Sequence, residues 1–272
     1  MAKTILLLAH PLYTKDTEVV SQIFKWWDAN GYEVRDVSDQ GLDNRIPKDI
    51  EVDFVLSLGG DGTMLRAAQL VMGTDIALVG VNFGRLGYLT QIEPDVVHSY
   101  FEKLLLHDYW LEEKATLQIT TGDNIFFCLN EVTIERAVPG HTISLALEIS
   151  KSRFISYRGD GVLIATPTGS TAYNLSLGGP ILSPTLKAMV LTPIAPHTLF
   201  DRSLILGDEE VVEAVLEDNS KALLVADGSL ISSIGAGNRI SVRAGAHKVR
   251  IVRFPGSDFY EVVREKFYMN DR

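Results

Sequence analysis

The stretch LSLGGDGTML, residues 56–65, places one carboxylate, Asp61, inside a glycine-rich turn between an apolar strand and the start of a helix. Glycine lets backbone amides approach a ligand closely, and a helix N-terminus favours anions, so a phosphate would fit this turn. Asp61 is itself an anion. A carboxylate in such a place is usually a structural cap, a metal-bridged contact to phosphate or a catalytic base, and this stretch alone leaves all three open.

A second stretch with chemical potential is RGDGVLIATPTGSTAYNLSLGGP, residues 158–180. Its order predicts a charged turn, a buried strand, a loop of hydroxyl residues and glycine, and a short helix. The hydroxyls around Gly169 suit two roles, because Ser and Thr cap helices and also bind ribose or phosphate oxygens. Tyr173 likewise suits stacking on a base or filling the core. The stretch by itself does not decide between these roles.

Asn130-Glu131 is a third candidate, placed between two predicted strands. An amide beside a carboxylate is able to bind a nucleobase edge and a ribose hydroxyl together. Without other information, an ordinary turn pair is the simpler interpretation. His141 follows Pro139-Gly140, and a histidine in such a loop is most often only solvated.

The elements that must position these residues change character along the chain. Strand and helix signals alternate through the first hundred residues, which predicts a parallel sheet covered on both faces. Ligands bind such sheets beyond the carboxyl ends of the strands, where the Asp61 turn and the later run Asn82-Phe83-Gly84-Arg85-Leu86-Gly87 are both expected. The predicted strands span residues 4–9, 32–37, 54–58 and 76–81, and the predicted helices span residues 17–30 and 96–106.

Beyond residue 106 the pattern becomes a series of short strand-like runs separated by turn residues, which indicates a second, largely β domain. The tail, residues 258–267, returns to helical spacing and is expected to pack on the first domain. The predicted strands of the second part span residues 117–121, 125–129, 132–136, 143–149, 154–157, 162–165, 203–206, 211–215, 222–225, 240–242 and 249–252.

Composition limits the function classes. The chain has 272 residues, 46% of them apolar and 22% charged, which is typical of a globular protein. The formal net charge of −10 argues against nucleic-acid binding through a broad basic surface. The apolar run near the N-terminus is too short to span a membrane, so we expect a cytoplasmic protein without a membrane partner. The single cysteine, Cys128, has apolar neighbours and is predicted to be a buried structural thiol.

Together, these stretches make the chain resemble NAD kinases, the enzymes that phosphorylate NAD to NADP. The resemblance spans about residues 5–267 and depends on four motifs in order: Gly59-Gly60-Asp61-Gly62-Thr63, Asn130-Glu131, Asp160-Gly161 and the run TPTGSTAY at residues 166–173. The first motif is shared with lipid kinases and phosphofructokinases. The TPTGSTAY run is close to diagnostic for NAD kinases.

The resemblance implies an NAD kinase-like two-domain fold. An α/β N-terminal domain with a parallel sheet would comprise residues 1–98 and be completed by residues 256–272. A β-rich, β-sandwich-like domain that binds NAD would comprise residues 99–255.

The resemblance also implies roles for individual residues. Asp61 would be the base that activates the 2′-hydroxyl of the adenosine ribose, and Asn130 and Glu131 would contact the adenosine part of NAD. Arg158 and Asp160 would lie at the nicotinamide side and reach a neighbouring subunit's site. The implied NAD-binding set is Asp61, Gly62, Asn130, Glu131, His141, Arg158, Asp160, Thr171, Ala172, Tyr173, Asn174, Leu175, Ser176, Ala195 and Ser229. The implied phosphate-binding set is Gly59, Gly60, Gly62, Thr63 and Arg66, although Arg66 also fits an ordinary helix surface.

Partners follow from the same resemblance. It implies NAD as acceptor, ATP or another phosphate donor, and Mg²⁺ or another divalent metal bound mainly through nucleotide phosphates rather than by protein ligands. It also implies a homo-oligomer, either a dimer or a tetramer. Two alternatives stand beside it: a lipid kinase of the diacylglycerol or sphingosine type, and a non-catalytic NAD(P)-binding regulator. The TPTGSTAY run argues against the first, and the presence of Asp61 argues against the second.

Overall fold

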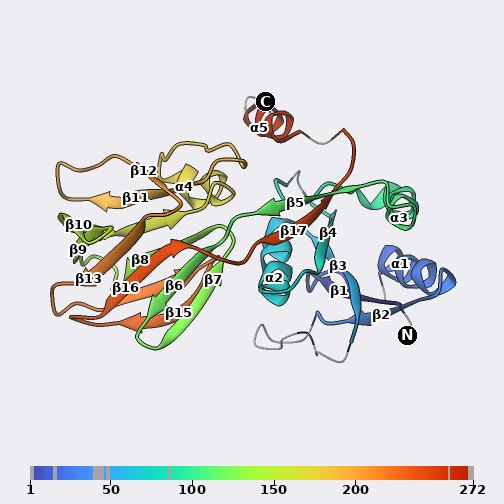
Figure 1. The fold of residues 1–272 in the computed structure, drawn as a ribbon, viewed down its shortest axis with the longest axis horizontal. Helices are drawn as coiled ribbons and strands as arrows, with labels where there is room; N and C mark the ends of the chain where they lie inside the picture. Colours follow the sequence, from blue (N-terminus) through green and yellow to red (C-terminus); the bar gives the residue numbers. More distant parts are fainter. Residues whose placement is uncertain are drawn as a thin grey trace. The chain divides into compact units, whose positions relative to one another are not determined.

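The computed structural model describes residues 3–14, 17–38, 46, 50–84, 87–256 and 258–268. The chain forms two compact units, the first built from Met1–Glu113 with Val249–Arg272 and the second from Lys114–Lys248. The second unit is therefore inserted in the sequence between two parts of the first, which runs from blue to green and ends in red in Figure 1. In the described ranges, no helix is both long and apolar enough to cross a membrane.

A six-stranded sheet forms the centre of the first unit, in the order β2-β1-β3-β4-β17-β5. The neighbours from β2 to β17 pair in parallel, which confirms the predicted parallel sheet. The strands are β1 (Lys3–Ala9), β2 (Tyr32–Asp36), β3 (Val52–Gly59), β4 (Ala77–Asn82), β5 (Trp110–Lys114) and β17 (Val249–Arg253).

Helices cover both faces of this sheet, with α1 and α3 on one face and α2 on the other (Figure 1). Buried residues recur every three or four positions in α1, at Val20, Ile23 and Trp27, and Gly31 follows its end with φ of 82°. The helices of the unit are α1 (Glu18–Ala29), α2 (Asp61–Val71), the short 3₁₀ turn η1 (Pro94–Val96), α3 (Val97–Leu105) and α5 (Phe259–Tyr268).

The second unit is one large antiparallel sheet in the order β15-β14-β8-β10-β9-β13-β16-β6-β7, with β11 pairing with β10 and β12. Its strands are β6 (Leu117–Thr121), β7 (Asn124–Cys128), β8 (Glu131–Arg136), β9 (Ile143–Ile149), β10 (Ser152–Ala165), β11 (Ala188–Pro196), β12 (Leu204–Gly207), β13 (Val211–Leu216), β14 (Ala222–Ala226), β15 (Ser229–Ile234) and β16 (Arg239–Ala244). The turn η2 (Gly169–Thr171) and the short helix α4 (Tyr173–Ser176) follow β10.

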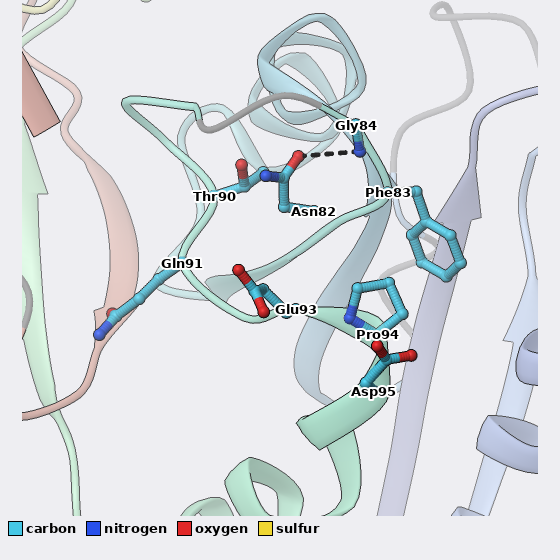
Figure 2. A pocket seen from close by; sticks show the side chains of 8 residues that line it. All are labelled: Asn82, Phe83, Gly84, Thr90, Gln91, Glu93, Pro94 and Asp95. Carbon is cyan, nitrogen blue, oxygen red and sulfur yellow. Dashed lines mark hydrogen bonds between the residues drawn. The ribbon is translucent and has the colours of Figure 1, made fainter. Parts of the chain in front are cut away.

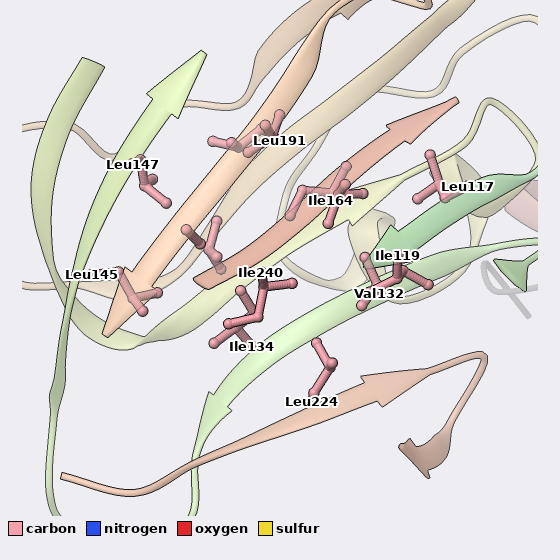
Figure 3. Packing of buried hydrophobic residues seen from close by; sticks show 14 of the residues in the cluster. Leu117, Ile119, Val132, Ile134, Leu145, Leu147, Ile164, Leu191, Leu224 and Ile240 are labelled. Carbon is pink, nitrogen blue, oxygen red and sulfur yellow. The ribbon is translucent and has the colours of Figure 1, made fainter. Parts of the chain in front are cut away.

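The core of the second unit gathers side chains from many strands of this sheet (Figure 3). Val132 and Ile134 of β8 are part of it, whereas Thr133 between them points to the opposite face because side chains alternate along a strand. Cys128 also belongs to this core and is 0% exposed, which confirms the predicted buried thiol. Burial raises the pKa of the Cys128 thiol well above its usual range.

One predicted turn is wrong. Arg158-Gly159-Asp160 does not leave the sheet but lies inside β10, a single strand that joins the two runs predicted at residues 154–157 and 162–165. Around these residues β10 changes partner, from β9 to β8 and β11. A side chain at Gly161 would place its Cβ 2.2 Å from the backbone oxygen of Ile134, so this glycine serves close strand packing rather than a turn.

The boundaries between the units also differ from the predicted ones. The chain passes between units at residues 113 and 248, not at 98 and 255. The reason is that β17, expected in the β-rich part, joins the first sheet beside β4, and β5 adds the last strand of that sheet. The C-terminal helix α5 belongs to the first unit, where Phe259 lies against the Tyr88 ring.

Candidate active site

Asp61 is the first residue of α2, directly after the N-cap residue Gly60. Its carboxylate accepts hydrogen bonds from the backbone N–H groups of Tyr88 at 2.9 Å and Leu89 at 3.0 Å. Both donors belong to the loop that follows β4, so the carboxylate is oriented by a segment distant in sequence. The positive end of the α2 dipole adds a second favourable interaction for its charge.

The loop can approach Asp61 this closely because residue 87 is glycine. A Cβ at Gly87 would lie 2.3 Å from Oδ1 of Asp61 and 2.5 Å from Oγ1 of Thr90. Any other residue would displace the carboxylate or the loop. Arg85 and Leu86, which belong to the predicted ligand-binding run 82–87, lie outside the described residues.

A pocket of about 350 Å³ opens beside this loop at the carboxyl end of β4 (Figure 2). Asn82 and Thr90 lie at one end of it and Asp95 at the other, with Glu93 between them. The Thr90 hydroxyl is buried and has no hydrogen-bond partner in the described part of the chain. The residues that line the pocket are Asn82, Phe83, Gly84, Thr90, Gln91, Glu93, Pro94 and Asp95.

The residues predicted to bind phosphate differ in what the structure offers. Gly60 and Gly62 have open space where a side chain would lie, so their backbone is accessible to a ligand. Gly59 instead makes room for the buried side chain of Thr63, whose Oγ1 would lie 2.2 Å from an added Cβ. The Nη2 atom of Arg66 donates a hydrogen bond to the backbone oxygen of Ser38 at 3.0 Å, so the guanidinium is already bound within the protein.

In the second unit, Asn130 and Glu131 lie where β7 gives way to β8, and both are buried. Oδ1 of Asn130 and Oε2 of Glu131 have no hydrogen-bond partner among the described residues. Buried polar atoms normally have partners, so these two oxygens are acceptor positions that a ligand or a water molecule can fill. This is the observation that fits the predicted adenosine contacts best.

Asp227 holds this pair in place. Its carboxylate accepts from the backbone N–H groups of Leu129 at 2.8 Å, Asn130 at 2.8 Å and Glu131 at 3.3 Å. Asp227 itself has φ of 47°, a left-handed conformation that few residues other than glycine adopt. Aspartate is among those that tolerate it, so backbone conformation and carboxylate contacts are consistent.

The TPTGSTAY run packs on the same segment. The Thr166 hydroxyl donates to the backbone oxygen of Leu129 at 2.7 Å. The backbone N–H of Thr166 donates to the backbone oxygen of Asn130 at 2.8 Å. A Cβ at Gly169 would lie 2.1 Å from the Asn130 oxygen, so this glycine permits the contact. The threonine and glycine residues of the run therefore build a support for Asn130 as well as any ligand surface.

Glu131 carries the clearest electrostatic perturbation of the site. Burial, reinforced by the negative charge of Asp227, raises the pKa of Glu131 to about 7. At neutral pH a substantial fraction of this carboxyl group is therefore protonated and able to donate a hydrogen bond as well as accept one.

The residues that follow Gly169 divide into exposed and internal ones. Tyr173 is 38% exposed, and burial raises the pKa of its hydroxyl, with further contributions from the charges of Glu135, Asp160 and Glu131. Asn174 is fully buried; its Nδ2 donates to the backbone oxygens of Ser170 and Pro180, and its Oδ1 accepts from Thr192. The Asn174 amide is thus engaged inside the protein. Thr171, Ala172 and Leu175 are partly exposed, and Ser176 is exposed.

Of the remaining predicted residues, four lie in β10 or beside it, away from its Ala165 end, whereas Ser229 lies close to the Glu131 end through the pairing of β15 with β14 and of β14 with β8. Asp160 forms an ion pair with Arg136 of β8 at 3.1 Å, and Nε of Arg158 donates to the Thr142 hydroxyl at 3.0 Å. His141 is exposed in the loop before β9. Ala195 in β11 is exposed, with φ of 43°, and Ser229, the first residue of β15, is exposed as well.

Sequence reasoning missed Asp227 and Arg136 as individual contributors. The segment Ala226-Asp227-Gly228-Ser229 contributes only Ser229 to the expected set, although the Asp-Gly turn signal inside it could have marked Asp227. Arg136 had no local signature, because its partner Asp160 lies on a neighbouring strand. For a metal, no group of three or more His, Cys, Asp or Glu side chains in the described ranges is arranged as a ligand set.

Comparisons with known proteins agree with this geometry. A family model described as ATP-NAD kinase N-terminal domain matches residues 20–109, and one described as ATP-NAD kinase C-terminal domain matches residues 129–254. A protein named NAD kinase from Caldicellulosiruptor saccharolyticus is 40% identical over 229 residues, covering 84% of this chain and 87% of its own.

Two solved structures share the fold. The crystal structure of yeast NADH kinase complexed with NADH is 22% identical, with a TM-score of 0.86, and the match covers 100% of this chain and 89% of that one. The structure of an NAD kinase from Archaeoglobus fulgidus in complex with ATP is 26% identical, with a TM-score of 0.75 and coverage of 94% of both chains. These matches confirm the two-domain fold and the resemblance expected from the motifs. The chain belongs to the NAD kinase family.

Proposed function

We propose that the chain transfers a phosphoryl group from ATP, or another phosphate donor, to the 2′-hydroxyl of the adenosine ribose of NAD, giving NADP. The observation that carries this proposal is the Asp61 carboxylate, which two backbone amides orient at the open, glycine-rich start of α2. The curated relative named NAD kinase and the solved complexes with NADH and ATP support the same substrates for this chain.

Asp61 acts as the general base in this proposal. A secondary hydroxyl is a weak nucleophile, and a carboxylate within hydrogen-bond reach takes its proton as the phosphoryl group arrives. The backbone of Gly60 and Gly62, which has open space around it, receives phosphate oxygens at the helix N-terminus. Little else is required of the protein, because phosphoryl transfer depends mainly on positioning and charge neutralisation.

A divalent metal, expected to be Mg²⁺, would neutralise phosphate charge. In this proposal the nucleotide phosphates supply most of the metal's ligands. The pocket at the end of β4 adds the carboxylates of Glu93 and Asp95, oxygen donors of the kind that such a metal and its waters accept.

Asn130 and Glu131 bind the adenosine part of NAD through the two oxygens that have no partner within the described chain. The exposed face of Tyr173 contributes apolar surface for a ring. The partly or fully exposed residues Thr171, Ala172, Leu175 and Ser176 line the dinucleotide pocket, with Arg158 and Asp160 at its nicotinamide side. Asn174 supports this turn from inside through its three hydrogen bonds. His141, Ala195 and Ser229 complete the proposed NAD-binding set.

Assembly and location belong to the proposal too. A homo-oligomer in which Asp160 and Ala195 reach a neighbouring subunit's site remains our expectation. Within its own chain Asp160 is held by Arg136, so its carboxylate is already oriented before any partner arrives. The cytoplasmic location expected from the sequence stays a prediction.

The test is a donor-by-acceptor assay on the purified chain. NADP formation is followed with an NADP-specific dehydrogenase while ATP, other nucleoside triphosphates and polyphosphate are paired with NAD or NADH. We expect NADP from NAD with at least one of these donors and only in the presence of a divalent metal. Turnover of a lipid acceptor with no NADP formed, or NAD binding without turnover under any donor, would contradict the proposal.

A further inference from the structure

The loop that orients Asp61 is itself held from its other side by Arg253, the last residue of β17. The guanidinium donates from Nη2 to the backbone oxygen of Tyr88 at 3.1 Å and from Nη1 to the backbone oxygen of Leu89 at 3.2 Å. Its Nε donates to Glu112 of β5 at 2.7 Å. Arg253 is 7% exposed. Arginine is rarely buried unless it is paired, and here its partners are the loop itself and one carboxylate.

Tyr88 and Leu89 therefore contact both the Asp61 carboxylate and the Arg253 guanidinium. Their N–H groups donate to Asp61, and their carbonyl oxygens accept from Arg253. The Tyr88 carbonyl and the Leu89 N–H belong to one planar peptide unit, so a single amide joins the guanidinium to the carboxylate. Hydrogen bonds arranged in such a chain polarise and strengthen one another.

We propose that Arg253 is a positioning residue for Asp61: it fixes the Tyr88–Leu89 segment so that both amides aim at the carboxylate. The inference rests on the proposed role of Asp61 as the base. Arginine suits this task because its planar fork supplies several N–H donors in fixed directions, two for the carbonyls and one for Glu112. Lysine, a point charge on a flexible stem, would hold the loop less firmly.

The chain offers a matched control on the same strand. Arg250 lies three residues before Arg253 in β17, pairs with Asp75 at 2.7 Å and Glu113 at 3.5 Å, and is one-third exposed. It has the same charge and a similar link to β5. If Arg253 merely stabilised this edge of the sheet, replacing either arginine would have comparable consequences.

The first measurement is steady-state kinetics of Arg253→Met, Arg253→Lys and Arg250→Met. We expect Arg253→Met to lower kcat about 100-fold, the size of effect that follows a small misplacement of a catalytic group, with the KM for NAD within about twofold of wild type. The kcat of Arg253→Lys should lie between those of the wild type and Arg253→Met. The lysine variant keeps the test valid if the methionine variant does not fold. Arg250→Met should keep the wild-type kcat. A folded Arg253→Lys or Arg253→Met variant with wild-type kcat would overturn the inference.

The second measurement does not depend on activity. Amide exchange at Tyr88 and Leu89, followed by NMR, should become faster in the Arg253 variants and stay unchanged in Arg250→Met, because only Arg253 holds these two residues. Unchanged exchange in the Arg253 variants would also overturn the inference. This readout remains available if the chain does not form NADP, so failure of the proposed function is distinguishable from failure of the positioning role.

The third measurement combines Arg253→Lys with Asp61→Asn. If Arg253 acts through Asp61, its replacement should cost no further activity once the base is gone, since effects of residues that act as a unit are not additive. Losses that multiply would assign Arg253 an independent role. If Asp61→Asn alone keeps normal turnover, the base assignment fails, and the exchange rates alone then decide whether Arg253 fixes the Tyr88–Leu89 segment.

Discussion

Two aspartates of this chain accept hydrogen bonds from backbone amides, and they do so for opposite purposes. In the first unit, Asp61 accepts from two amides that lie 27 and 28 positions further along the chain. In the second unit, Asp227 accepts from three amides of Leu129, Asn130 and Glu131. In the first region, the amides of the Tyr88–Leu89 loop orient the Asp61 carboxylate, which is the proposed functional group. In the second region, the Asp227 carboxylate fixes the backbone of the segment that carries the proposed ligand contacts.

The difference shows that hydrogen-bond chemistry alone does not reveal a functional residue. The deciding feature is whether the carboxylate itself, or the segment that donates to it, has polar groups accessible to a ligand. Asp61 lies beside glycines with open space around them, whereas near Asp227 the atoms Oδ1 of Asn130 and Oε2 of Glu131 have no hydrogen-bond partner among the residues that the structure describes. In the proposed function, Asp61 is the reacting group of its region, and Asp227 supports the Asn130-Glu131 segment.

Asp61→Asn should have the largest effect. The amide is nearly isosteric but cannot take a proton, and general-base catalysis is typically worth 10²–10⁴-fold, so we expect kcat to fall by about that factor. The NAD dissociation constant should change by only a few-fold. Steady-state kinetics and calorimetric NAD titration give the two values. Near-normal turnover in a folded variant would show that Asp61 is not the base.

Gly87→Ala should disturb the orientation of the Asp61 carboxylate without replacing Asp61 itself. The added Cβ would lie 2.3 Å from Oδ1 of Asp61, and the end of a side chain moves more readily than backbone. We expect a folded protein with kcat reduced about 100-fold. Thermal unfolding together with kinetics tests this, and unchanged kcat would mean that the orientation set by the loop is not required.

Asp227→Asn should shift the effect from kcat to NAD binding. It weakens charge-assisted hydrogen bonds, each worth about 1.5–3 kcal/mol, and so loosens the Asn130-Glu131 segment. Because 1.4 kcal/mol corresponds to a tenfold change, we expect the KM for NAD to rise about tenfold or more, with a smaller change in the KM for the donor.

Asp218 supplies the matched control for this prediction. Its carboxylate also accepts from backbone amides, those of Ser144 and Ser220, but it supports a turn that carries no predicted ligand contact. Asp218→Asn should lower thermal stability and leave the KM for NAD unchanged. Equal KM effects from the two variants would indicate general loosening of the second unit rather than support of one segment.

A further effect is a pH dependence of stability that comes from Glu131 in the second region. The pKa of Glu131 is about 7 in the folded protein, against about 4.3 for an unperturbed glutamate. Between these values the folded state binds the proton more tightly than the unfolded state, so this residue's contribution to stability is present at low pH and is lost as pH rises through 7.

Glu131→Gln should remove that dependence. Urea unfolding from pH 4 to 8 should show the wild type losing stability relative to the variant as pH rises, by about 1.4 kcal/mol for each pH unit between the two pKa values. A difference between the two proteins that stays constant across this range would show that Glu131 titrates normally.

Local signals were sufficient for part of this picture. The strand, glycine turn and helix around Asp61 follow one another within a few residues, so their pattern predicted both the turn and its carboxylate. The pairing of Asn130 with Glu131 was visible for the same reason. Residues 158–161 were misread because Gly159 and Gly161 signal a turn locally, whereas in the sheet they allow neighbouring strands to approach.

The supporting contacts were out of reach for a physical reason. Arg253 and Leu89 are 164 positions apart, and Asp227 and Asn130 are 97 apart. A hydrogen bond between such residues leaves no periodicity in either segment. Strand β15 was missed because its serines do not resemble a strand, and β11 because Pro193 and Pro196 interrupt its pattern.

The ends of the second unit have a consequence for how this chain can be rebuilt. The backbone oxygen of Thr116 accepts from Gly245 at 2.7 Å, and its hydroxyl donates to the oxygen of His247 at 2.6 Å, so the segments that enter and leave this unit run side by side. A unit whose first and last segments lie next to each other can be replaced as a whole without moving the chain ends that it joins. The corresponding unit of a relative could be exchanged at residues 114 and 248 while every contact from Arg253 to Asp61 stays within the recipient.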